Sequence, residues 1–262
     1  PIDRPAIAAA AVNAPAPPSG ETLIRYMKGM PLDFNPGEKF AYSNFGYIIL
    51  GRVIERVSGM PYKEFVRARV LDAVGANRTQ QGRSRMADAL AEEVKYYSPP
   101  SSSINALLVP SVFPGEGLVP FTYGGFHLEV SDASGAWLSS TIDLLRLVGG
   151  IDGRANRPDI LSAALITEMT GNGATVWSSG ACYYGAGWFV RPTQGDANWW
   201  HGGSLPGTTA MLVRTYNNFS WIGLDNARSL SPNSEPELDA ALWNAFAGVT
   251  SFPTHDLFST FR

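Results

Sequence analysis

The sequence predicts an α+β fold in which an antiparallel sheet is flanked by helices and joined to a mainly helical insertion. Apolar residues recur at helical spacing through much of residues 21–175. From about residue 176 the pattern changes to short segments rich in β-branched and aromatic residues, such as "TAMLVRTY" and "FSWIGLD". Helices followed by an antiparallel meander and one packing helix are typical of the α+β class.

The first part of the chain predicts an arm and then several helices. Residues 1–20 are rich in Ala and Pro and nearly chargeless, so we expect a loop or an extended arm or linker there. Each expected helix combines an apolar stripe with a Ser, Thr, Pro or Gly signal at one end. The expected helices cover about residues 21–28, 45–58, 61–74, 141–148 and 158–169.

The second part predicts the sheet. Residues 98–125 hold too many Pro, Gly and Ser residues for regular elements, and a loop of that length is often a wall of a binding cleft. Later strands flank Asn217-Asn218, a good hairpin turn, and a final helix is expected near residues 235–247. We therefore expect an arm (1–20), a mainly helical part (21–175) and a sheet with its C-terminal helix (176–262), the last two forming one catalytic-type unit.

Composition excludes several classes of function. The chain has 262 residues, a formal charge of −3 and a pI near 5.6, which gives no electrostatic reason to expect nucleic acid. No apolar run approaches the ~20 residues of a membrane span. One cysteine, Cys182, excludes an intrachain disulfide, and we interpret it as a small buried residue. No metal-ligand spacing or phosphate-binding loop is present, so no cofactor is expected.

Two short polar clusters are the candidate functional residues. The first, "AYSNFGYIILG" at residues 41–51, holds Tyr42 and Asn44 directly before a helix, where they are either helix-start residues or catalytic groups. The second, "WWHGGSLPG" at residues 199–207, holds His201, Gly202, Gly203 and Ser204. Its glycines would let a ligand backbone come close and would leave the Ser204 N–H free for a carbonyl oxygen. The alternative is a glycine-rich turn just before a strand at 209–216.

Four segments, which follow one another along the chain in the family's own order, resemble the serine β-lactamase and penicillin-binding protein superfamily, in its class C-like branch. They are similar to the family's Tyr-x-Asn segment, its Gly-Gly-Leu-x-Ser-Thr helix, its Tyr-Gly-x-Gly-Trp strand and its third motif, Lys-Thr-Gly or His-Gly-Gly. The segments are "NPGEKFAYSNFGYIILGRVIERVSGMPYKEFV", "SGAWLSSTIDLLRLV", "YGAGWFV" and "HGGSLPGTTAML". The resemblance spans about residues 21–248 and implies a β-lactamase/transpeptidase-like fold. The branch includes class C β-lactamases, family VIII esterases and DD-peptidases.

The resemblance implies acyl-enzyme chemistry on an ester, an amide or a β-lactam. Tyr42 would be the base or proton shuttle, and Asn44 would hold a substrate amide or the lysine of Ser-x-x-Lys. His201 would replace the lysine of the third motif, and Gly202, Gly203 and Ser204 would form the strand beside the substrate. The Ser204 N–H would be one half of the oxyanion hole. Because histidine is not a permanent cation, we expect esters or peptides to be better substrates than β-lactams.

The chain departs from the family at the nucleophile. The family acts through a serine in Ser-x-x-Lys, and no serine or threonine here has lysine three residues later. The chain begins with Pro1 rather than Met, so we expect a longer precursor whose N-terminal part is missing here. The resemblance favours a periplasmic or secreted protein.

Three hypotheses stay open. The chain is either half of a hydrolase whose nucleophile lies on a companion chain, an inactive truncated fragment, or a pseudo-enzyme that binds without chemistry. The remaining polar candidates are weaker: His127 and His255 are interpreted as solvent or core histidines, and Asp143 and Glu168 as surface charges on helices.

Overall fold

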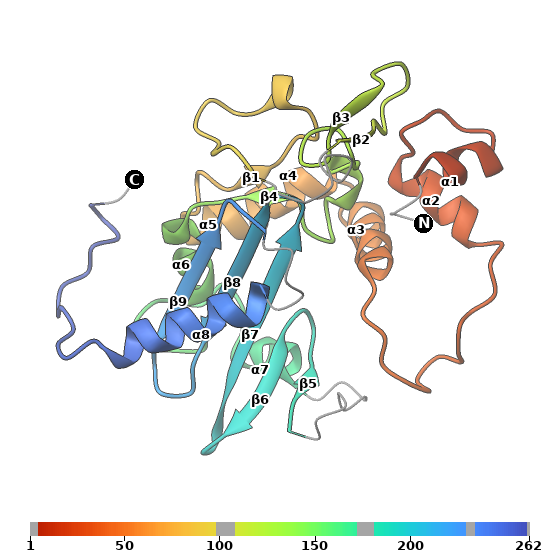
Figure 1. The fold of residues 1–262 in the computed structure, drawn as a ribbon. Coiled ribbons are helices and arrows are strands. Elements are labelled where there is room, and N and C mark those ends of the chain that lie inside the picture. Colours follow the sequence, from red (N-terminus) through yellow and green to blue (C-terminus); the bar gives the residue numbers. More distant parts are fainter. Residues whose placement is uncertain (1–4, 98–107, 172–180, 229–233, 261–262) are drawn as a thin grey trace. The chain divides into compact units, whose positions relative to one another are not determined.

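The computed structural model describes residues 5–97, 108–171, 181–228 and 234–260 (Figure 1). The chain forms two compact units. The first unit comprises residues 1–69 and 80–138, and the second comprises residues 70–79 and 139–262. Tyr42 and Asn44 belong to the first unit, and His201–Ser204 belong to the second. No helix among the described ranges is long and apolar enough to cross a membrane.

The first unit consists mainly of helices. Its elements are α1 (Pro5–Ala11), α2 (Gly20–Met27), α3 (Asn44–Ser58), α4 (Tyr62–Val66), the 3₁₀ turns η2 (Met86–Asp88) and η4 (Glu129–Ser131), and the strands β1 (Gln80–Gln81), β2 (Leu108–Pro110), β3 (Leu118–Pro120) and β4 (Trp137–Leu138). A π-helical turn, η1 (Arg67–Leu71), follows α4 and continues into the second unit. The expectation of an extended arm was wrong for residues 5–11, because an alanine-rich stretch there forms α1.

Local end signals position α2 and α3 as the sequence predicted. The Ser19 side chain accepts a hydrogen bond from the Thr22 N–H at the start of α2. Gly59 ends α3 with φ of 70°, a left-handed conformation that glycine adopts without strain. Leu23 of α2 and Ile48 of α3 are fully buried in one cluster with Ala8 of α1. This cluster fixes α3, and with it the segment that carries Tyr42 and Asn44.

Two expectations from the sequence need correction, one about a loop and one about the start of a helix. Within the expected loop at 98–125, residues 98–107 lie outside the described residues, and β2 and β3 pair antiparallel with Val109 opposite Val119. Short valine-containing strands formed in spite of the flanking prolines, which end each strand. The helix expected from Pro158 starts later, as α7 (Ala163–Thr170), because the hydroxyl of Ser162 accepts the Leu165 N–H at its start.

The second unit contains the predicted sheet. Its helices are α5 (Asp72–Val74), α6 (Thr141–Gly149), α7 and α8 (Ser234–Ala247), and its strands are β5 (Tyr183–Tyr184), β6 (Phe189–Thr193), β7 (Asp196–Leu205), β8 (Thr208–Arg214) and β9 (Ser220–Asp225). The five strands are antiparallel in the order β5-β6-β7-β8-β9. The hairpin predicted within residues 209–225 is therefore confirmed, with Arg214 opposite Ser220 as its last registered pair.

Helix α8 lies across one face of this sheet (Figure 1). Gly223 of β9 has no side chain, and a Cβ atom there would lie 3.0 Å from Leu242 and 3.1 Å from Leu238 of α8. Two residues earlier, on the same face, the rings of Trp221 and Trp243 meet edge to face at 4.6 Å. The predicted packing of the last helix on the hairpin is confirmed, and the small residue in β9 allows its close approach.

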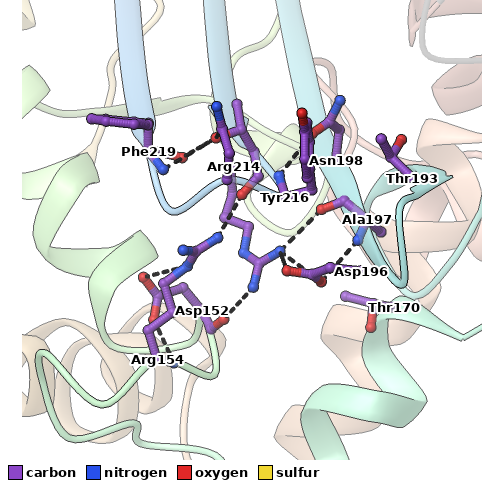
Figure 2. A network of polar contacts seen from close by, with 12 residues as sticks. Asp152, Arg154, Thr170, Thr193, Asp196, Ala197, Asn198, Arg214, Tyr216 and Phe219 are labelled. Atoms are coloured by element: carbon purple, nitrogen blue, oxygen red, sulfur yellow. Dashed lines mark hydrogen bonds and ion pairs between the residues drawn. The ribbon is translucent and has the colours of Figure 1, made fainter.

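A buried arginine joins β8 to the loop after α6 (Figure 2). The guanidinium of Arg214 donates to both carboxylate oxygens of Asp196, at 3.0 and 2.9 Å, and to the carbonyl oxygens of Ala197 and Asp152. Arg154 donates to the carbonyl oxygen of Thr215 from the same loop. These bonds satisfy the backbone carbonyls of Ala197, Asp152 and Thr215, which lie near the start of β7 and far along the strand from Ser204. We interpret the network as structural.

Asp143 is a further correction. It was expected at the surface, yet its side chain is only 1% exposed. The carboxylate accepts the backbone N–H of Arg78 at 2.8 Å and pairs with Arg146 at 2.9 Å. Its position in the first turn of α6 faces residues 75–79, which carry donors that the sequence pattern does not reveal. Glu168 of α7 is exposed, as expected.

Candidate active site

In the Tyr-Ser-Asn segment, the serine caps a helix and the residues on either side of it are exposed. Ser43 caps α3, because its hydroxyl accepts the Gly46 N–H at 3.0 Å. Tyr42 precedes the cap and is 49% exposed, and Asn44 is the first residue of the helix and is also exposed. Capping therefore uses only Ser43 and does not account for the tyrosine or the asparagine on either side of it.

The His-Gly-Gly segment lies inside a strand. The residues alone placed it just before a strand at 209–216, and the resemblance implied that Gly202, Gly203 and Ser204 form the strand beside the substrate; all four residues from His201 to Ser204 belong to β7. They pair in order with Leu212, Met211, Ala210 and Thr209 of β8. The turn interpretation was wrong, because glycine in a paired strand is tolerated where another group approaches closely.

One edge of β7 has no partner strand among the described residues at this segment. The ladder between β6 and β7 ends at the pair Phe189–Trp200. Beyond it, residues 201–205 pair with β8 on one side, and no other strand in the described ranges pairs with them on the other side. An unpaired strand edge presents backbone N–H and C=O groups that can bind an extended ligand.

The imidazole of His201 is held by two hydrogen bonds. Its Nε2 lies 2.9 Å from the Tyr184 hydroxyl of β5, and its Nδ1 lies 2.5 Å from the Gly202 carbonyl oxygen. The ring also packs against Tyr184 and Phe189, with centroid distances of 5.9 and 5.7 Å. The side chain is therefore oriented within the second unit by β5 and β6.

The two glycines differ in what surrounds them. A Cβ atom at Gly202 would lie 2.3 Å from a carboxylate oxygen of Glu235, in the first turn of α8. A Cβ atom at Gly203 would meet only the Cβ of Ala210, at an ordinary contact distance of 3.5 Å. Gly202 thus makes room for Glu235, whereas the space at Gly203 is open to a ligand.

The charge balance at His201 favours the neutral ring. Burial lowers the pKa of His201 below its ordinary value, while the Gly202 carbonyl and the Glu235 carboxylate act in the opposite direction without overcoming it. The histidine therefore supplies no permanent positive charge at neutral pH. A lysine at this position, which the resemblance gives as the alternative in the third motif, would carry such a charge.

Other polar candidates have structural surroundings. Cys182 is buried and accepts a hydrogen bond from Arg191, in agreement with its interpretation as a structural residue. His127 packs edge to face on Phe113 and lies 3.7 Å from Glu129, and His255 is exposed. No group of three or more His, Cys, Asp or Glu residues in the described ranges could hold a metal ion.

Two hollows on the surface of the described residues lie away from the candidate residues. One, of about 530 Å³, lies in the first unit beside Arg52 and Glu55. Another, of about 540 Å³, lies in the second unit beside Arg146 and Arg157. Neither is lined by Tyr42 or by His201, and we give more weight to the strand edge because it combines open backbone groups with an oriented imidazole.

Comparison with known proteins decides the family. A model of the family described as Beta-lactamase matches residues 2–240. The chain belongs to this family. Penicillin-binding protein 4* of Bacillus subtilis is 26% identical over 194 residues, which are 71% of this chain and 39% of that protein. A relative named putative D-alanyl-D-alanine carboxypeptidase, from Salmonella newport, is 34% identical over 61 residues, 23% of this chain and 14% of the relative.

Solved structures share the fold. The octameric penicillin-binding protein homologue from Pyrococcus abyssi matches 91% of this chain and 51% of its own, with 25% identity and a TM-score of 0.61. The D-amino acid amidase from Ochrobactrum anthropi SV3 matches 89% of this chain and 66% of its own, with 19% identity and a TM-score of 0.65. The resemblance and the α+β fold class are thereby confirmed. The chain spans well under two thirds of the length of the curated relatives it matches.

The sequence did not single out Tyr184 or Glu235. Tyr184 is the first residue of "YGAGWFV", the segment similar to the family's Tyr-Gly-x-Gly-Trp strand, so a signal for it was present. Glu235 carried no motif, and only the register that places α8 over Gly202 reveals it.

Proposed function

We propose that this chain carries the Tyr-x-Asn and His-Gly-Gly parts of an acyl-transfer site in a serine hydrolase of the Beta-lactamase family. The observation that carries the proposal is the open edge of β7 at residues 201–205. A substrate laid along this edge would pair with backbone groups of Ser204, because the N–H and C=O of successive residues point to opposite edges of a strand and those of Gly203 face β8. The Ser204 N–H would then be one donor to the developing oxyanion.

Tyr42 and Asn44 supply the second part of the proposed site. Tyr42 would be the base or proton shuttle, and the Asn44 amide would hold the substrate. The exposure of both side chains, next to a helix cap that needs neither, supports this role. Their convergence with His201 is part of the proposal.

The nucleophile would come from a companion segment that carries Ser-x-x-Lys, because the 262 residues contain no such motif. Helix α3 supports this part of the proposal. Four apolar side chains along it are exposed, namely Ile49 (37%), Leu50 (53%), Val53 (49%) and Val57 (83%). A helix with an uncovered apolar stripe is typical of a surface that binds another element.

The proposed substrate is an ester or an amide in preference to a β-lactam. A neutral His201 and the nearby carboxylate of Glu235 give little attraction for the carboxylate of a penicillin. The D-amino acid amidase with the same fold is named for an amide substrate, whereas the name of penicillin-binding protein 4* points to a β-lactam ligand, so both classes belong in the test.

Intact-protein mass spectrometry tests the proposal. The chain alone is incubated with benzylpenicillin and, separately, with p-nitrophenyl acetate, and no stable acyl adduct is expected. When a polypeptide that carries a family Ser-x-x-Lys completes the site, an adduct should form on that serine. Tyr42→Phe should then reduce the acylation rate strongly, because the nucleophile loses its proton acceptor; general-base catalysis contributes ~10²–10⁴-fold.

Tyr47→Phe is the matched control, since it removes a phenol hydroxyl from α3 itself without touching the proposed site. An acyl adduct on Ser43 or Ser204 of the chain alone, lost when that serine becomes alanine, would show that the nucleophile is misplaced. Acylation that proceeds equally well in Tyr42→Phe would contradict the role of the tyrosine. Ligand binding without any acylation, even in the completed protein, would favour the pseudo-enzyme alternative.

A further inference from the structure

The hydrogen bonds around His201 fix which ring nitrogen carries the proton. The Gly202 carbonyl oxygen, 2.5 Å from Nδ1, can only accept a hydrogen bond, so Nδ1 must be the donor. In the neutral ring, Nε2 then has a lone pair and no proton. The Tyr184 hydroxyl at 2.9 Å is the group that donates to it.

Tyr184 is itself held in place. It lies on β5, directly opposite Phe189 of β6, and the two rings meet edge to face at 4.8 Å. Phe189 in turn stacks on Trp200 of β7 at 5.7 Å. The phenol is therefore fixed by aromatic contacts, so its hydroxyl is directed at His201 in advance of ligand binding. Its neighbour Tyr183 instead donates to the Thr170 carbonyl oxygen of α7.

Glu235 acts on the same ring from another element. Its carboxylate lies over Gly202, and its negative charge favours the protonated imidazole. Tyr184 from β5 and Glu235 from α8 are titratable groups that act on His201, and β6 contributes the apolar ring of Phe189. The hydrogen bond from Tyr184 therefore favours the neutral ring, whereas Glu235 favours the protonated ring.

We propose that Tyr184 is the positioning residue of His201: its hydroxyl donates to Nε2 and holds the imidazole as the neutral Nδ1–H tautomer beside the open edge of β7. The role of this ring in acyl transfer rests on the proposed function, whereas the tautomer is a property of the second unit by itself. With Nε2 engaged, His201 is not the proton acceptor for the nucleophile. A phenol oxygen that donates its proton to Nε2 can still accept a hydrogen bond, so Tyr184 would be an acceptor for a substrate N–H.

This arrangement defines a class of substrate. An oriented phenol oxygen, a neutral imidazole and the Glu235 carboxylate offer acceptors and negative charge, and no fixed cation. Acyl groups that are uncharged or carry an amine fit these groups, and acyl groups with a carboxylate do not.

Nitrogen-15 NMR of the 262-residue chain tests the proposal without any activity. The chain has three histidines, so long-range ¹H–¹⁵N spectra are simple, and the absence of one set of signals in His201→Gln assigns the ring. At neutral pH the spectrum should show a protonated Nδ1 and an unprotonated Nε2. An Nε2–H tautomer at His201, or a doubly protonated ring at pH 7, would overturn the proposal.

Two pairs of variants separate positioning from folding. In Tyr184→Phe the neutral ring loses its donor, so the titration midpoint of His201 should move up and the second tautomer should appear. Tyr183→Phe removes a hydroxyl from the adjacent residue and should change neither. Glu235→Gln should move the midpoint down, and Glu237→Gln is its control on the same helix turn. If Tyr184→Phe folds but leaves both the midpoint and the tautomer unchanged, Tyr184 is not the positioning residue.

If the NMR results hold and acylation of the completed protein still fails, the positioning role stands and the proposed function is at fault. If acylation succeeds but His201 is the Nε2–H tautomer, the proposed function stands and the positioning role of Tyr184 is wrong.

Discussion

Replacement of Asp143 by alanine should destabilise the second unit strongly, although the residue stands on a helix whose sequence predicts a surface charge there. The side chain is 1% exposed and joins α6 to residues 75–79. Asp143→Ala removes the acceptor for the Arg78 N–H at 2.8 Å and for the Thr79 hydroxyl at 3.4 Å. It also leaves the guanidinium of Arg146 without the carboxylate at 2.9 Å.

The expected cost follows from these contacts. Removal of one partner from a buried ion pair costs ~3–5 kcal/mol. Arg146 keeps two other acceptors, the carbonyl oxygens of Gly75 and Phe258 at 3.2 and 2.9 Å, which places the loss at the lower end. We therefore expect a loss of about 3 kcal/mol in the free energy of unfolding, which corresponds to a fall in Tm of roughly 6–12 °C.

Thermal unfolding followed by tryptophan fluorescence measures this loss, because Trp188, Trp199 and Trp221 all lie in the second unit. Asp143→Asn keeps an acceptor oxygen and should lose only about 1–2 kcal/mol. Glu168→Ala, at an exposed acidic residue of α7, is the control and should stay within ~0.5 kcal/mol of the parent. If Asp143→Ala were as mild as Glu168→Ala, the buried network would be wrongly described.

Two further predictions concern a glycine and a carboxylate. Gly203→Ala should leave Tm nearly unchanged in thermal melts, since its Cβ meets only Ala210 at 3.5 Å. It should nevertheless slow acylation of the completed protein, because residues 201 and 203 share a face of the sheet and the added methyl group would stand beside His201; a large drop in Tm would show that the position is closely packed. For Glu129, burial opposes ionisation, but hydrogen bonds from the hydroxyl and N–H of Ser84 outweigh it and lower the pKa. A lowered folded-state pKa gives stability that is present above the unfolded value of ~4.3 and is lost as pH falls through the folded value. Urea titrations of the parent and Glu129→Gln should therefore converge in acid, and a gap that widened on acidification would contradict this sign.

The parts of the fold that sequence predicts well are those determined by neighbours in the chain. Ser19 caps the start of α2 and Gly59 caps the end of α3 through hydrogen bonds within a few residues. The hairpin around Asn217 follows from two strands that are close in sequence. The stripe of α3 was recognised by its period, which is local information. Its exposure depends on packing partners, and the period alone does not reveal it.

The parts that were missed depend on distant partners. Asp143 is buried because backbone donors about 65 residues away face it. The residues around His201 left a glycine-rich turn open as an alternative, and only the pairing with β8 along the whole segment shows that His201 is part of the strand. Gly202 was interpreted as space for a ligand, but a helix that starts at residue 234 places Glu235 there. None of these contacts leaves a periodic signal in the sequence.

The proposed function requires that Tyr42, Asn44 and His201–Ser204 come together in one site, although 159 residues separate Tyr42 from His201. The distance between the Tyr42 hydroxyl and the His201 imidazole in a crystal structure of this chain tests it most directly. We predict a separation within about 10 Å, a few times the ~3 Å of a direct hydrogen bond, which leaves room for a substrate between the two groups. A clearly larger distance, with both units folded as described, would contradict the assignment of a shared acyl-transfer site.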